Sequence, residues 1–314
     1  MASLPANSPD QYRVSVIIPH FNMPGALARC LCSVQAQAQA LDGKVEIIVV
    51  DNGSRLTPEA VLAGYPDVRY LQEPTPGPGP ARNAGVAAAS APVLAFIDAD
   101  CRAGKLWLKV AVEAVETGGN RTVVGGDVGI DFVDPDHLTA VEAYEAVFAY
   151  RQRMYIEQQG FSATCNLAMH RDVHAAVGPF AGIGLAEDRD WGQRASAAGF
   201  RPVYVPAMCI YHPARADVAS LMVKWQRHVA HDWAEHRAAG KPLWHWLLKA
   251  ALMPASVLVD GARLLFSGRL SGLANKRRGL VVLARIRLLR GAEMLRVIGA
   301  TGEDAATHWH GGAA

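Results

Sequence analysis

The sequence predicts an α/β fold: a doubly wound, nucleotide-binding sheet of the Rossmann-like kind, followed by an α-helical C-terminal extension. Within the first hundred residues, four short apolar runs alternate with segments of helical composition, as in sheets covered by helices on both faces. After about residue 216, apolar residues recur at helical spacing among many basic side chains. With 51% hydrophobic residues in 314, the chain can bury one large core and carry an appendage.

The first predicted unit is strand, helix, strand. Residues 14–18 and 45–50 are nearly continuous apolar runs, which indicates parallel strands buried on both faces. The segment 24–40 between them has helical composition and begins with a proline, which is favourable in a first helical turn. The next expected elements are a helix at 57–64, strands at 68–71 and 93–97, and a Pro/Gly loop at 74–80. Sheets of this kind bind ligands at the carboxyl ends of their strands.

Two carboxylates, Asp98 and Asp100, follow the last of these strands. A hard cation prefers oxygen ligands and is often shared with substrate phosphates, so this pair predicts a site for Mn²⁺ or Mg²⁺ and a nucleotide-diphosphate substrate. The alternative is that the two residues cap the following helix. A second pair, Asp134 and Asp136, flanks a proline without a preceding apolar run, and we interpret it as a solvated turn.

Polar residues also follow the second strand, in the run Asp51-Asn52-Gly53-Ser54. A carboxylate and an amide there can bond the imide edge of a uracil-like base or a ribose hydroxyl. Because Asn-Gly is also strong turn chemistry, an ordinary turn remains the alternative. The Pro/Gly loop leads into Arg82, whose guanidinium suits phosphate oxygens if the loop folds over the site.

These motifs resemble those of glycosyltransferase family 2, in order and in spacing. They are Pro19-His20-Phe21-Asn22, Asp51-Asn52-Gly53-Ser54, Ala81-Arg82-Asn83-Ala84-Gly85 and Asp98-Ala99-Asp100. Three later motifs look like the acceptor-side motifs of the family: Thr164-Cys165-Asn166, Gly178-Pro179-Phe180 and Glu187-Asp188-Arg189-Asp190-Trp191. The resemblance covers about residues 13–215 and implies the GT-A fold and inverting transfer of a sugar from a nucleotide-sugar.

The resemblance also implies roles for individual residues. Donor-binding residues are Pro19, Asn22 and Asp51 in the nucleoside pocket, Arg82, Asp98 at the ribose or the metal, and Asp100 at the metal. His212, in Tyr211-His212-Pro213, resembles the position where many GT-A enzymes supply a histidine to the metal. Imidazole is an acceptable ligand for Mn²⁺, so the implied metal ligands are Asp100, His212 and Asp98.

Asp188 is implied as the catalytic base. An inverting transfer is a single in-line displacement, so a carboxylate must remove the proton of the acceptor hydroxyl as its oxygen attacks. The alternative is that Glu187 and Asp188 only stabilise the start of a helix that Gly199 ends. Asp190 is another candidate base, although two positions along a helix place it on a different face. The implied acceptor-side residues are Asn166, Glu187 and Trp191.

The C-terminal region predicts amphipathic helices. Apolar residues recur at helical spacing from Val218 to Val229. Gln226 is not followed by the Arg-Trp that completes the Gln-x-x-Arg-Trp motif of processive family members. The apolar stretch 244–266 has an uncharged run of only ten residues, too short to span a membrane. Residues 261–300 carry nine basic residues against one acidic residue, which favours an anionic membrane surface, with a helical dimer interface as the alternative.

The remaining expectations concern organisation and location. We expect a flexible N-terminus (1–12), a catalytic domain (13–216), a basic helical region (217–300) and a disordered tail (301–314). The net charge of +2 gives no argument for nucleic-acid binding, and five scattered cysteines fit a reduced compartment. The first ten residues lack the features of a secretory signal, so we expect a cytoplasmic protein, peripheral on the cytoplasmic face of the membrane.

Taken together, the sequence predicts an inverting, metal-dependent glycosyltransferase that moves one sugar to a hydroxyl acceptor. A lipid-linked or cell-surface glycan precursor would account for the basic C-terminus, and a UDP-sugar donor is favoured by the resemblance. A homodimer remains open. Two other functions also remain open: a nucleotidyltransferase, which would normally carry a Gly-rich basic phosphate loop that is missing after the first strand, and a non-catalytic nucleotide-sugar-binding module.

Overall fold

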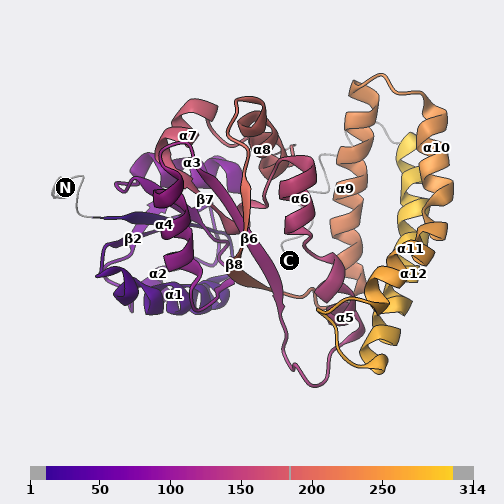
Figure 1. Cartoon of the computed structure of the whole chain (residues 1–314), viewed down its shortest axis with the longest axis horizontal. Helices are drawn as coiled ribbons and strands as arrows, with labels where there is room; N and C mark the ends of the chain where they lie inside the picture. The colour runs from indigo at the N-terminus through magenta and orange to yellow at the C-terminus, as the bar shows by residue number, and fades with distance from the viewer. Residues whose placement is uncertain (1–11, 184, 300–314) are drawn as a thin grey trace. The chain divides into compact units, whose positions relative to one another are not determined.

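The computed structural model describes residues 12–183 and 185–299 (Figure 1). The tail expected to be disordered at 301–314, and all but the last residue of the N-terminus expected to be flexible at 1–12, lie outside the described residues. The chain divides into two compact units. Unit 1 comprises residues 12–129 and 151–212, and unit 2 comprises residues 130–150 and 213–299. The sequence did not separate residues 130–150 from their neighbours, because no composition shift marks them.

The sheet has eight strands in the order β3-β2-β1-β4-β7-β6-β8-β5. The strands are β1 (Val14–His20), β2 (Val45–Asp51), β3 (Arg69–Gln72), β4 (Val93–Phe96), β5 (Arg102–Ala103), β6 (Val123–Asp131), β7 (Leu167–His170) and β8 (Val203–Pro213). The first four strands pair with one another in parallel, which confirms the four strands predicted from the apolar runs. β4 and β6 pair antiparallel with β7, and β5 pairs antiparallel with β8, so the sheet is mixed.

Helices and the sheet of unit 1 enclose a core whose central side chains include Ile17, Ile48, Phe96 and Leu167. The helices of this unit are α1 (Pro24–Ala38), α2 (Glu59–Leu62), α3 (Pro78–Ala88), α4 (Trp107–Gly118), α6 (Gln152–Gln159), α7 (Arg171–Val177) and α8 (Glu187–Ala197). The expected Pro/Gly loop is shorter than predicted, because α3 already begins at Pro78, where proline is favourable in the first turn.

Unit 2 is helical, as the apolar spacing predicted (Figure 1). Its helices are α5 (Ala140–Phe148), α9 (Val218–Ala238), α10 (Leu243–Leu252), α11 (Val257–Leu265) and α12 (Leu273–Arg296). Capping boxes begin α5 at Thr139 and α9 at Asp217. Leu221, Leu264 and Leu283 pack with residues of α5 in one core. In the described part of the chain, no helix combines the length and the apolar content needed to cross a membrane.

Candidate functional site

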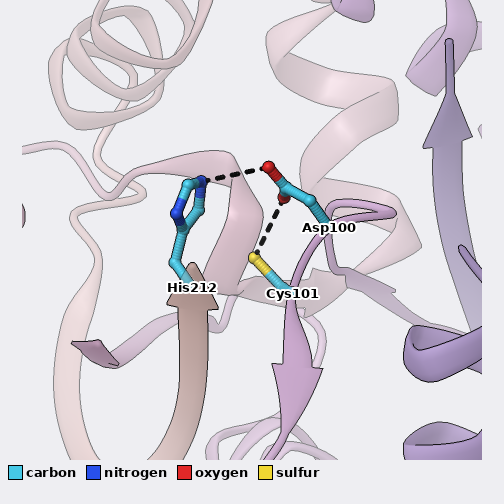
Figure 2. Close-up of side chains that lie close together, drawn as sticks. All are labelled: Asp100, Cys101 and His212. Carbon is cyan, nitrogen blue, oxygen red and sulfur yellow. Dashed lines mark hydrogen bonds and ion pairs between the residues drawn. The ribbon is translucent and has the colours of Figure 1, made fainter. Parts of the chain in front are cut away.

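The pairing of β5 with β8 brings His212 beside Asp100. In this antiparallel pair Arg102 faces Tyr211, so the residues just before β5 lie opposite the end of β8. The Nε2 atom of His212 lies 3.4 Å from one carboxylate oxygen of Asp100. Figure 2 shows both side chains pointing toward each other, with the thiol of Cys101 on the other carboxylate oxygen. β8 runs to Pro213 and therefore carries the histidine near the end of the strand.

Asp100, Cys101 and His212 each offer one ligand atom, and these three atoms lie within 4.8 Å of one another. A carboxylate and an imidazole fit a divalent cation such as Mn²⁺. The Sγ atom of Cys101 lies 3.6 Å from Oδ1 of Asp100, and sequence reasoning did not identify this residue. Burial raises the pKa of Asp100, the charge of His212 opposes this, and the charge of Asp98 adds to it. Burial and a second carboxylate thus disfavour the charged form of Asp100, and a cation bound nearby would stabilise that form.

Arg82 is the buried cation of this site. It is 2% exposed, and its guanidinium contacts Oδ1 of Asp98 at 2.7 Å and Oε1 of Glu187 at 3.1 Å. Burial alone would lower the pKa of Arg82, but the charges of Asp98, Glu187 and Asp188 raise it above its ordinary value. A Cβ on Gly85 would lie 2.4 Å from Cγ2 of Ile17, so only glycine lets α3 pack this closely on β1 and carry Arg82 into place. Arg82 thereby connects the end of β4 to the start of α8.

Asp188 stands in the first turn of α8, next to Glu187. Burial, together with the charge of Glu187, raises the pKa of Asp188 to about 6, while the backbone N–H of Arg189 and the charge of Arg82 oppose the increase. A pKa near neutrality is what a general base needs. Asp190 does not share this environment, because its carboxylate binds Arg194 at 2.9 Å.

The nucleoside-side motifs form a hydrogen-bonded turn. Nδ1 of His20 lies 2.9 Å from Oδ1 of Asp51, whose other oxygen accepts from the backbone N–H of Ser54. Met23 N–H donates to Nε2 of His20, so Nδ1 carries the proton that Asp51 accepts. Burial tends to raise the pKa of Asp51, but the hydrogen bonds from Ser54 and His20 lower it overall. Asp51 is only 2% exposed. Its carboxylate therefore stabilises this turn and has little surface available to contact a nucleobase.

Asn22 and Pro19 complete this part of the site. Asn22 adopts φ 55°, and its Oδ1 accepts from the backbone N–H groups of Arg55 and Leu56. Asparagine tolerates this left-handed conformation better than most residues, which accounts for its place here. Pro19 is half-buried in β1, immediately before His20.

Two asparagines position the loops around the site. Asn52 donates to the carbonyls of Glu73 and Thr75 and accepts from Gly77 N–H, so its amide fixes the loop before α3. These hydrogen bonds favour the interpretation of the Asn-Gly motif as an ordinary turn. Asn83 donates to the carbonyl of Phe180 and accepts from its N–H. Sequence reasoning did not assign Asn83 a role, although it follows Arg82 directly in the motif.

Asn166 and Trp191 do not fit the acceptor contacts expected of them. Asn166 is 0% exposed and accepts from Nε1 of Trp107 while donating to the carbonyls of Asp127 and Met208. Trp191 is 1% exposed, packs on Phe180, and donates its Nε1–H to the carbonyl of Gly178. Because neither side chain reaches the surface, both act as supports of the site in this structure. Of the three expected acceptor-side residues, only Glu187 is partly exposed, at 18% of its side chain.

Asp134 and Asp136 confirm the interpretation as a solvated turn. Both are exposed, and Oδ1 of Asp134 accepts from the backbone N–H of Asp136. They belong to unit 2, whereas the expected metal ligands all lie in unit 1.

Comparisons with known proteins identify relatives of this chain. The family model for glycosyl transferase family 2 matches residues 15–179. The chain is 32% identical to glycosyltransferase AglE of Haloferax volcanii over 208 residues, 64% of this chain and 67% of that protein. It is 35% identical to validoxylamine A glucosyltransferase of Streptomyces hygroscopicus over 106 residues, 32% of this chain and 25% of that protein.

A solved structure has a similar fold. The mannosyltransferase PcManGT of Pyrobaculum calidifontis, in complex with GDP-Man and Mn²⁺, matches with a TM-score of 0.51 and 18% identity. The match covers 96% of this chain and 80% of that one. At this identity the likeness establishes the fold, and it is the GT-A fold with a helical C-terminal region that the sequence predicted.

Proposed function

Because the chain belongs to glycosyltransferase family 2, we propose that it transfers one sugar from a nucleotide-diphosphate sugar to a hydroxyl acceptor, with inversion at the anomeric carbon. The observation that carries this proposal is the position of Asp188. Its carboxylate has a pKa of about 6 and lies in the electrostatic field of Arg82, which also binds Asp98 at the end of β4. A base and a cation for the donor therefore occur together at one edge of the sheet.

In the proposed reaction, the acceptor oxygen forms a bond to the anomeric carbon as the bond from that carbon to the diphosphate oxygen breaks. Asp188 takes the hydroxyl proton during attack, and the electron pair of the broken bond leaves with the nucleoside diphosphate. Glu187 holds Arg82 at 3.1 Å and raises the pKa of Asp188 by its charge, so we assign it as a positioning residue. The turn around Asn22 and Asp51 would border the nucleoside.

Asp100 and His212 would hold a divalent cation, with Asp98 near it. The cation, when bound, supplies positive charge against the departing diphosphate. Mn²⁺ and Mg²⁺ both accept a carboxylate, and the imidazole favours Mn²⁺. The Mn²⁺ in the complex of the mannosyltransferase with the similar fold supports this choice.

The donor is testable by thermal unfolding with UDP-, GDP-, dTDP- and CDP-sugars, each with and without Mn²⁺. A ligand at 100 times its dissociation constant stabilises the folded state by about 2.7 kcal/mol. The resemblance of Asp51 to the family pattern favours uridine, and the bound GDP-Man of the similar structure makes guanosine the second choice. A metal-dependent shift with one nucleotide is the expected result, whereas no shift with any of them would contradict the proposal.

We further propose that unit 2 binds an anionic membrane surface, where a lipid-linked acceptor would be presented. Large apolar side chains are exposed on three of its helices: Trp244, Leu248 and Leu252 on α10, Leu258 and Val259 on α11, and Val281, Leu288 and Leu295 on α12. Basic residues are interleaved with them, a combination that favours lying on anionic lipid. A dimer interface would use the same side chains.

Vesicle sedimentation separates these two uses. We expect binding to anionic vesicles that weakens with salt, and loss of most of it in Leu258→Gln with Val259→Gln, at 80% and 68% exposure. Val133→Gln is the matched control, because Val133 is 95% exposed in the same unit but lies outside its helices. Wild-type binding by the double variant would refute the membrane proposal, and a change in its oligomeric state would favour the dimer.

A further inference from the structure

Cys101 lies beside the proposed metal ligands but has no role in the proposed reaction. Its backbone N–H donates to the carbonyl of Asp98 at 3.0 Å, which closes a turn just before β5. Consecutive residues of an extended strand point to opposite faces, whereas this turn brings the side chains of Asp100 and Cys101 together. Figure 2 shows both of them close to His212. The turn therefore adds a sulfur atom to the expected carboxylate and imidazole.

The three potential ligand atoms have a spacing near that of a metal site. Nε2 of His212 lies 3.4 Å from Oδ2 of Asp100, and Sγ of Cys101 lies 3.6 Å from Oδ1 of the same carboxylate. With one atom taken from each residue, all three lie within 4.8 Å of one another. Bonds of about 2.0–2.3 Å to a tetrahedral Zn²⁺ place neighbouring ligand atoms about 3.3–3.8 Å apart. A cation of this size therefore requires only a modest closure of the group.

The group is accessible from solvent on one side. The side chains of Asp100 and His212 are 28% and 14% exposed, whereas Cys101 is 1% exposed and forms the buried side. Asp98, which the family resemblance implied as a third ligand, has its Oδ1 bound to Arg82 at 2.7 Å and is not part of this group of described residues. A cation that enters beside Asp100 and His212 therefore meets the thiol of Cys101 as its next ligand.

We propose that Cys101 is the third protein ligand of this site, and that the site takes a divalent cation with affinity for sulfur, such as Zn²⁺ or Co²⁺. This inference rests on the proposed function, which assigns Asp100 and His212 to the cation. Thiolate ligands select such cations, whereas Mg²⁺ prefers oxygen ligands. The thiolate is the form that binds a metal, so binding releases the thiol proton to solvent. Burial raises the pKa of the Cys101 thiol, so the proton is lost only when a cation binds the sulfur.

A purely structural role for the thiol is the alternative. Without a cation, the thiol of Cys101 donates to Asp100 and contacts the thiol of Cys165, so hydrogen bonding alone would account for its position. Cys101→Ser separates the two roles, because a hydroxyl remains a hydrogen-bond donor but removes the soft sulfur ligand. This variant should therefore keep the unfolding midpoint of the metal-free protein while its binding of soft cations changes.

Cobalt reports sulfur ligation directly, because a thiolate on Co²⁺ gives a charge-transfer absorption band in the near ultraviolet. Co²⁺ is titrated into the full-length wild type, Cys101→Ser and Cys32→Ser, where Cys32 is exposed on α1 and provides the matched control. We expect the band in wild type and in Cys32→Ser. In Cys101→Ser we expect no band and Co²⁺ binding weakened by about 10- to 100-fold. A band of wild-type intensity in Cys101→Ser overturns the proposal.

A second measurement needs no substitution within the site. X-ray absorption by stoichiometric Zn²⁺ bound to Cys32→Ser should show one sulfur neighbour at about 2.3 Å, and a shell of nitrogen and oxygen alone overturns the proposal. The Mn²⁺-dependent thermal shift with nucleotide-sugars tests the proposed function separately. A thermal shift without a sulfur neighbour would refute only the role of Cys101, whereas the absence of both would contradict the proposed function as well.

Discussion

The substitution Asp188→Asn tests the electrostatics of the site through stability as well as through turnover. A pKa of about 6 in the folded protein, instead of 3.8, means that the folded state disfavours the charged carboxylate by about 3 kcal/mol at most. The interaction with Glu187 is shared between the two residues, so a measured value of about 1–3 kcal/mol is expected. Asparagine has a similar shape and no charge, and should therefore stabilise the folded protein at high pH.

The sign of the effect follows from the raised pKa. Between pH 4 and pH 6 the folded wild type holds a proton on Asp188 that the unfolded chain has released. The contribution of this residue to the free energy of unfolding is therefore lost as the pH rises through about 6. Below pH 4 both states are protonated, and the asparagine variant should match wild type. Above pH 7 the difference in favour of the variant should reach its plateau. The same protonation should lower wild-type kcat/KM below about pH 6.

Urea unfolding at pH 4 and pH 8 measures this difference, with Asp67→Asn as the control, because Asp67 is exposed and forms no ion pair in the described chain. We expect the Asp188 variant to gain stability only at pH 8 and to lose turnover by about 10² to 10⁴, the usual range for removing a general base. A variant that is less stable than wild type at pH 8 would refute the assignment of a disfavoured charge. Undiminished turnover would refute the assignment of the base.

Three further substitutions test supports of the site. Gly85→Ala places a Cβ 2.4 Å from a methyl of Ile17, so we expect a loss of about 1–3 kcal/mol in denaturant unfolding; an unchanged midpoint would contradict the packing argument. Asn166→Ala removes the hydrogen bonds to Trp107 Nε1 and to two backbone carbonyls, and should cost about 3–5 kcal/mol in the same assay. Asp100→Ala should abolish Mn²⁺-dependent stabilisation by the nucleotide-sugar without lowering the midpoint of the free protein, and retained Mn²⁺ dependence would count against its role as a ligand.

Local patterns were sufficient for the strand framework. Continuous apolar runs are buried on both faces in a parallel sheet, so β1, β2 and β4 could be located to within about two residues. The carboxyl ends of these strands also locate Asp51 and Asp98, because strand direction determines where such residues lie. The part of the site made by neighbouring parallel strands was therefore accessible from sequence.

Long-range pairing accounts for what the sequence did not reveal. Cys101 lies near His212 only because β5, two residues long, pairs with the end of a strand more than a hundred residues later. The burial of Asn166 likewise depends on three partners from separate elements. The identity of a polar residue in a motif does not show whether that residue contacts a ligand or stabilises a loop. Only its hydrogen-bond partners distinguish these two roles.

Charge balance connects the proposed metal to the proposed base. Four carboxylates, those of Asp98, Asp100, Glu187 and Asp188, act on one another or on Arg82, and Arg82 and Arg189 supply the opposing charge. Without a cation this site is negative when all four are ionised, and it would repel a nucleotide diphosphate. A divalent cation on Asp100 and His212 offsets that excess, so metal and donor should each strengthen the binding of the other. The raised pKa of Asp188 is caused mainly by burial, and the charge of Glu187 adds to it. A nearby divalent cation should lower that pKa further below neutral pH.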